Sequence, residues 1–139
     1  MYESFGINRL SIGVQSFQTQ LLKFLARTHE RNDIFKTYNN ARSVGFENIN
    51  IDLIYSIPGQ TLKLWEKDLN EVAALHPEHI STYNLTLEKG TELFKMVEKD
   101  LVAMPSENVN AGFFKKTVSF LKSKNYKFYE VSSFSKSDF

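Results

Sequence analysis

Alternation of apolar and polar side chains, which only Ile54 breaks, marks residues 48–55 as a strand with two unlike faces. The apolar face consists of Ile49, Ile51, Leu53 and Tyr55. The other face consists of Asn48, Asn50, Asp52 and Ile54. Residues 57–61 read Ile-Pro-Gly-Gln-Thr and lead into a helical pattern, which is typical of an α/β unit. Strands of such units are usually buried on both faces, so the polar face needs an explanation.

Two further segments, residues 8–16 and 79–87, show weaker alternation and are also predicted to be strands. The apolar face of the first consists of Leu10, Ile12 and Val14, and its other face of Arg9, Ser11, Gly13 and Gln15. In the second, we expect Ile80, Thr82, Asn84 and Thr86 on one face, and Ser81, Tyr83 and Leu85 on the opposite face. We place Tyr55 and Tyr83 on the apolar side, in the core. Each strand thus has one face with polar or small residues.

Apolar residues recur at helical spacing between and after these strands. Helices are predicted over residues 19–25, 33–44 and 61–76, from residue 92, and after Pro105-Ser106. Thr61 is the expected N-cap of the third helix and Gly45 the expected C′ residue of the second. Residues 126–134 are predicted to form a last strand. Strands that alternate with helices predict an α/β fold with a parallel sheet.

The polar strand faces favour a barrel or half-barrel lumen that holds a polar ligand, because buried polar groups without partners are costly. Gln15, Asp52 and Asn84 fall at or near the C-terminal ends of their strands, where barrel enzymes build their sites. The alternative to a lumen is a flat sheet with one face exposed to solvent. A closed barrel needs more strands than this chain supplies. Residues 1–6 resemble the last turn of a helix, so we expect a piece of a larger protein.

Composition narrows the classes of function. The 139 residues fit one domain, and 17 basic against 16 acidic residues leave a formal charge of +1. That charge does not indicate nucleic acid or anionic lipid as a partner. The sequence shows neither an apolar run of the ~20 residues that a membrane span needs nor a signal peptide, so we expect a cytoplasmic protein. The chain has no cysteine, and we expect no metal ligands among its three histidines.

Five segments follow one another in chain order: GINRLSIGVQSF, LLKFLARTH, NINIDLIYSIPGQT, PEHISTYNLTLEKGTEL and NYKFYEVSSFSK. Together they resemble the oxygen-independent coproporphyrinogen III oxidase family of radical S-adenosylmethionine (SAM) enzymes. The resemblance covers nearly the whole chain. The motifs ARTH, PGQT and LTLEKGT look more like the heme-chaperone branch of that family than the branch that decarboxylates coproporphyrinogen.

The resemblance implies a partial (β/α)6 barrel, a TIM-like half-barrel of parallel strands. Residues 1–139 would form a single domain with the last three barrel strands, the following helix and a strand. The family's Cys-x-x-x-Cys-x-x-Cys motif, its glycine-rich segment and its C-terminal region are not found in this chain. The family usually has glycine where this chain has Ser56.

The resemblance also assigns cofactor-binding residues. Gln15 would contact SAM, Arg27 would bind its carboxylate, and Asp52 would accept its ribose hydroxyls. Thr86, or Asn84 beside it, would add a further contact through the backbone. The alternatives for the first three are a polar strand end, a solvated helix-end arginine and an internal ion pair. No catalytic residue is assigned, because SAM carries the chemistry.

In this family a [4Fe-4S] cluster reduces SAM. One branch decarboxylates coproporphyrinogen III to protoporphyrinogen IX, an oxidoreductase step of porphyrin and heme biosynthesis. The chaperone branch transfers heme to acceptor proteins. This chain alone is predicted to be inactive, because no thiolate can hold the cluster. A generic α/β sugar- or nucleotide-binding domain is the third hypothesis. The unpaired edge of the first strand predicts self-association.

Overall fold

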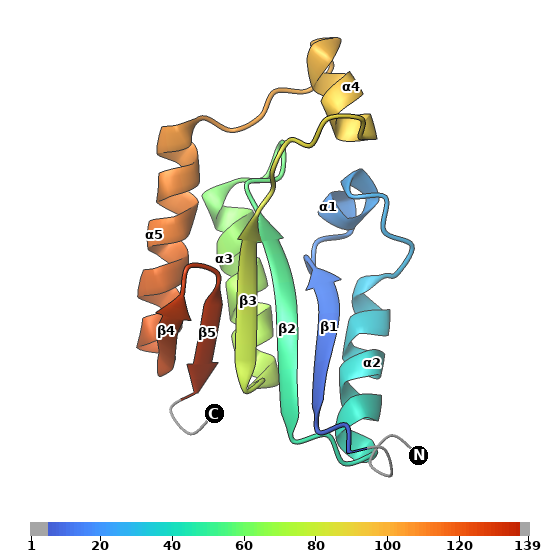
Figure 1. Cartoon of the computed structure of the whole chain (residues 1–139), viewed down its shortest axis with the longest axis vertical. Helices are drawn as coiled ribbons and strands as arrows, with labels where there is room; N and C mark the ends of the chain where they lie inside the picture. Colours follow the sequence, from blue (N-terminus) through green and yellow to red (C-terminus); the bar gives the residue numbers. More distant parts are fainter. Residues whose placement is uncertain (1–5, 137–139) are drawn as a thin grey trace.

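The computed structural model describes residues 6–136, so the helical turn expected at residues 1–6 lies outside the described part except for Gly6. Five strands and five helices are assigned there, and Figure 1 labels them. The strands are β1 (Arg9–Gln15), β2 (Asn48–Tyr55), β3 (His79–Asn84), β4 (Tyr126–Glu130) and β5 (Ser133–Lys136). The helices are α1 (Thr19–Phe24), α2 (Arg31–Ser43), α3 (Leu62–Leu75), α4 (Glu92–Glu98) and α5 (Glu107–Ser123).

The five strands form one sheet in the order β1-β2-β3-β5-β4. Strands β1, β2 and β3 are parallel neighbours, which confirms the predicted α/β half-barrel. The prediction of a single last strand over residues 126–134 is wrong. That segment belongs to the antiparallel hairpin of β4 and β5, and β5 pairs antiparallel with β3. Val131 and Ser132 at the turn are neither glycine, proline nor asparagine, so the usual turn signal is missing.

Helices α2, α3 and α5 cover one face of the sheet (Figure 1). The apolar side chains of β2 point into this layer: Ile49, Ile51 and Leu53 are fully buried. Trp65 of α3 is also fully buried, and its indole N–H donates to the Thr117 hydroxyl of α5 at 2.8 Å. The opposite face of β1, β2 and β3 is not covered by a helix of the described chain, and we call it the open face.

Local signals set most helix ends. The Thr61 hydroxyl accepts a hydrogen bond from Leu64 N–H, which confirms the expected N-cap of α3. Gly45 has φ 99° and closes α2 with hydrogen bonds from Gly45 N–H to Arg42 and from Phe46 N–H to Ala41. These two bonds form a Schellman motif, as expected for a C′ glycine.

A cluster of hydrogen bonds ties α2 to the N-terminal ends of β2 and β3. The Arg42 guanidinium lies 3.0 and 2.8 Å from the two Glu78 carboxylate oxygens. It also donates to the Tyr38 hydroxyl and to the carbonyls of Phe46 and Glu47. This cluster lies at the end of the sheet where barrel folds place stabilising residues.

Candidate functional site

Four polar side chains on the open face form one hydrogen-bonded network around Asp52. The Ser11 hydroxyl donates to Asp52 Oδ2 at 3.0 Å, and the Asn50 amide donates to Asp52 Oδ1 at 2.7 Å. The same Asn50 amide donates to the Ser11 hydroxyl at 2.8 Å, and the Ser81 hydroxyl donates to Asn50 Oδ1 at 3.0 Å. The network thus holds the Asp52 carboxylate by one donor on each oxygen.

The strand register explains why these residues meet. Asn50 pairs with Ser11 of β1, and Asp52 pairs with Ser81 of β3. Asn50 and Asp52 are two positions apart on β2, so their side chains share a face. Asp52 is partly exposed. Because each carboxylate oxygen accepts about two hydrogen bonds, the carboxylate can still accept hydroxyl donors from a ligand.

Gln15 occupies a strained turn at the C-terminal end of β1. Its φ is +68°, and the Ser16 N–H donates to the Val14 carbonyl at 2.9 Å across it. A hydrogen bond from residue i+2 to residue i around a positive φ is the mark of the rare γ-turn. The pairing register with β2 shifts between Gly13 and Gln15, so this turn forms an irregularity in the strand.

The turn brings the Gln15 side chain back over Gly13. A Cβ atom on Gly13 would lie 2.9 Å from Gln15 Nε2, closer than real side chains allow. Gly13 pairs with Asp52, so the Gln15 amide and the Asp52 carboxylate both lie on the open face beside the C-terminal end of β1. The structure therefore places these two predicted site residues together, and it gives the absence of a side chain at Gly13 a reason.

Arg27 lies in the connection between α1 and α2, with an exposed side chain. The Arg27 N–H donates to the Leu22 carbonyl at 2.9 Å. The N–H of Ala26, which has φ 54°, donates to the Lys23 carbonyl. This Schellman motif fixes the backbone at Arg27 and leaves its guanidinium in solvent. The connection follows α1, which lies beyond the C-terminal end of β1 (Figure 1).

The structure corrects the predicted faces of residues 79–87. Ser81 and Tyr83, not Ile80 and Asn84, share the open face, because Ser81 pairs with Asp52 and Tyr83 with Ile54. Ile80 is fully buried, whereas Tyr83 is 46% exposed and does not lie in the core. Both faces of this strand mix polar and apolar residues, so the sequence pattern alone does not orient it.

Thr86 is exposed and lies beyond the end of β3, which is shorter than predicted. Its hydroxyl donates to Glu88 Oε1 at 3.2 Å, within its own loop. The neighbouring alternative, Asn84, pairs with Tyr55, on the face that the helices cover. Neither side chain joins the Asp52 network. The contact of Thr86 through its backbone stays a prediction.

Sequence reasoning missed the serines of the site. The alternation of its strand places Ser11 on the open face but gives it no role. The pattern of residues 79–87 places Ser81 with Tyr83 on the apolar side, whereas both serines lie on the open face. The only signal for either serine is its register with Asn50 and Asp52, which becomes visible once the strands are paired. Within residues 6–136, the structure shows no cluster of three His, Asp or Glu side chains that could hold a metal ion.

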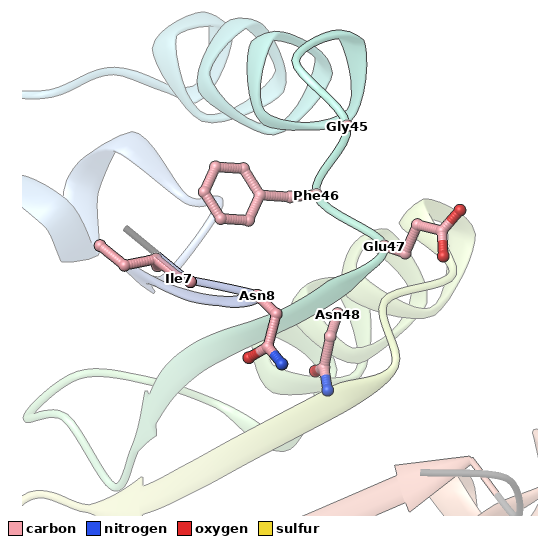
Figure 2. A pocket seen from close by; sticks show the side chains of 7 residues that line it. Ile7, Asn8, Gly45, Phe46, Glu47 and Asn48 are labelled. Carbon is pink, nitrogen blue, oxygen red and sulfur yellow. The ribbon is translucent and has the colours of Figure 1, made fainter. Parts of the chain in front are cut away.

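A separate open pocket lies at the other end of β1 and β2. Figure 2 shows its lining side chains. Asn8 and Asn48 lie on one side of the two strands, and the Phe46 ring lies on the other side. Asn48 is the first residue of β2, four positions before Asp52, and it makes none of the hydrogen bonds of the Asp52 network, so this pocket does not belong to that network. No described helix is long and apolar enough to cross a membrane.

Comparisons with known proteins identify the family of the chain. A family model described as the radical SAM superfamily matches residues 2–72. The chain is 37% identical to "Heme chaperone HemW" of Bacillus subtilis over 131 residues, 94% of this chain and 35% of that protein. It is also 37% identical to "Radical S-adenosyl methionine domain-containing protein 1, mitochondrial" of Danio rerio, covering 96% of this chain and 30% of that protein.

Among solved structures, the chain resembles the Escherichia coli coproporphyrinogen III oxidase HemN, a radical SAM enzyme. The TM-score is 0.83 at 30% identity, over 99% of this chain and 32% of that one. The chain thus spans about a third of the length of the proteins it matches. It belongs to the radical SAM superfamily and, within it, to the coproporphyrinogen III oxidase-like family.

Proposed function

We propose that the open face binds SAM as part of a radical SAM protein that handles a tetrapyrrole. The observation that carries the proposal is the Asp52 carboxylate, oriented by Ser11 and Asn50 on the open face beside the C-terminal end of β1. An oriented, partly exposed carboxylate suits a ligand with paired hydroxyl groups, as in nucleotide sites that bind a ribose.

In this proposal each predicted residue has one role. Asp52 accepts hydrogen bonds from the ribose hydroxyls, and the exposed guanidinium of Arg27 pairs with the carboxylate of the methionine moiety. Gln15 contributes an amide on the same face. Thr86, with Asn84 as the alternative, adds a backbone contact after β3. The proposal is supported by one carboxylate and one amide on the open face beside the C-terminal end of β1, and by an exposed cation in the connection after α1.

The iron–sulfur cluster does not fit these 139 residues, which contain no cysteine. We propose that residues 1–139 form one domain, the C-terminal part of a (β/α)6 barrel, and that cluster ligands come from another segment of a longer protein. The outer edge of β1 would then pair with a preceding barrel strand or with another copy of the chain. Alone, the chain would not cleave SAM.

For the tetrapyrrole we propose heme transfer, in the cytoplasm, because several relatives at 37–39% identity carry the name heme chaperone. Decarboxylation of coproporphyrinogen III to protoporphyrinogen IX is the alternative, favoured by the likeness to HemN. Two measurements on the anaerobically reconstituted full-length protein separate them. Stoichiometric heme binding and transfer without protoporphyrinogen formation supports the chaperone, whereas product formation from coproporphyrinogen contradicts it.

The SAM site is tested by Asp52→Ala and Arg27→Ala in the full-length protein. Each variant removes one hydrogen-bonding charge, worth about 1.5–3 kcal/mol, so SAM should bind roughly 10- to 150-fold more weakly. Calorimetric titration measures the affinity, and iron content per chain should stay unchanged. Glu47→Ala and Lys36→Ala, both at exposed positions away from the network, serve as charge-matched controls. Unchanged SAM affinity in both site variants would refute the proposed site.

A further inference from the structure

The carboxylate of Asp68 is fully buried in α3 and accepts three hydrogen bonds from neutral groups of the β1–α1 connection. The Ser16 hydroxyl donates to Oδ2 at 2.7 Å, and the Phe17 N–H donates to Oδ1 at 2.9 Å. The Gln18 side-chain amide also donates to Oδ1 at 3.0 Å. Burial raises the pKa of this carboxyl, and the same hydrogen bonds oppose the rise. A buried acid with such a set of donors holds the segment that supplies them.

The three donors follow Gln15 directly in the chain. Gln15 is the centre of the γ-turn, with φ +68°, a conformation that is strained for a residue with a side chain. Such strain persists only where the surrounding structure fixes the backbone on either side. Before Gln15, pairing with β2 fixes Gly13. After Gln15, the bonds to Asp68 fix residues 16–18.

Asp68 also links the two strands of the proposed site. It lies on α3, the helix that follows β2, and β2 carries Asp52. The same βα unit therefore holds Asp52 on the open face and, through Asp68, the end of β1 that carries Gln15. We propose that Asp68 is a positioning residue, which fixes the γ-turn and thereby holds the Gln15 amide over Gly13. This inference rests on the proposed SAM-binding function of the open face.

The test is a double-mutant cycle on SAM affinity in the full-length protein. Gln15→Ala should weaken SAM binding about tenfold, as expected for one lost hydrogen bond. Asp68→Ala should weaken it by a similar factor. If Asp68 acts through Gln15, the double variant should also bind about tenfold more weakly, whereas independent effects would multiply to about a hundredfold.

Two further variants separate positioning from general stability. In Asp68→Asn, the side-chain oxygen can still accept the hydrogen bonds from Phe17 and Gln18, and the side-chain NH2 can donate to the Ser16 hydroxyl. This variant should therefore keep most of the SAM affinity. Thr117→Val removes a buried hydroxyl that bonds to Trp65, away from the turn, and should lower stability with unchanged SAM affinity. If Asp68→Ala does not fold, Ser16→Ala takes its place in the cycle, because it removes one bond to Asp68.

Each outcome decides between the two proposals. A tenfold loss in both single variants with no further loss in the double variant supports the positioning role. If Gln15→Ala weakens binding but Asp68→Ala does not, or if the two effects multiply, the positioning role is overturned and the SAM site stands. If Gln15→Ala leaves SAM affinity unchanged, the proposed role of Gln15 fails, and the inference about Asp68 fails with it.

Discussion

Removal of Arg42 should cost this fold more stability than removal of any arginine that makes only a surface pair. Arg42 pairs with Glu78 at 2.8 Å, and their side chains are only 29% and 11% exposed. Without Arg42, the Glu78 carboxylate keeps a hydrogen bond from Ile49 N–H but loses its charged partner. The carbonyls of Phe46 and Glu47 also lose their donor.

The magnitude follows from this burial. Breaking a fully buried pair by removing one partner costs about 3–5 kcal/mol, and partial exposure of Arg42 reduces this to about 2–4 kcal/mol. The pair of Arg31 and Glu71 is the matched control, because its N···O distance is 2.7 Å but its side chains are 47% and 29% exposed. Arg31→Ala should therefore cost about 0.2–1 kcal/mol.

Urea unfolding followed by circular dichroism gives the change in the free energy of unfolding for Arg42→Ala and for Arg31→Ala, provided that the slope of each transition is unchanged. A cycle with Glu78→Gln isolates the interaction between Arg42 and Glu78 from the other contacts of the guanidinium. If Arg42→Ala costs no more than Arg31→Ala, the low-exposure pair contributes nothing beyond a surface pair, and the reasoning from burial is wrong.

Two more predictions concern the open face. Gly13→Ala should lower SAM affinity about as much as Gln15→Ala while leaving the melting temperature nearly unchanged, because the new Cβ displaces only the flexible end of Gln15; equal affinity for wild type and Gly13→Ala would contradict this. Burial and the charge of Arg9 lower the pKa of His79 below its ordinary value of 6.5, against the opposing charge of Glu78. The folded chain then binds a proton less tightly than the unfolded chain, so stability should fall as the pH drops from about 6.5 through the lowered pKa. His79→Gln should reduce that fall in urea unfolding at pH 7.5 and 5, and an identical fall in both proteins would refute the assignment.

The sequence by itself determined the elements that depend on local patterns. Strand β2 has the predicted bounds, because an alternation that only Ile54 breaks leaves one possible assignment of its two faces. Thr61 caps the start of α3 and Gly45 closes the end of α2, as predicted. Such caps depend only on a side chain or a φ angle near the helix terminus. The open face with Gln15 and Asp52 also followed from alternation. The order of the five motifs along the chain also indicated the family.

Only the tertiary structure decided the features that depend on pairing between distant segments. The hairpin of β4 and β5 forms against β3, and no local turn signal at Val131 marks it. Ser81 faces Asn50 because the parallel register with β2 requires it, although the pattern of its own strand is ambiguous. The hydrogen bonds of Asp68 join residues about 50 positions apart in the chain. Periodicity reports which way a side chain points along its own element, whereas strand register and helix packing decide what it meets.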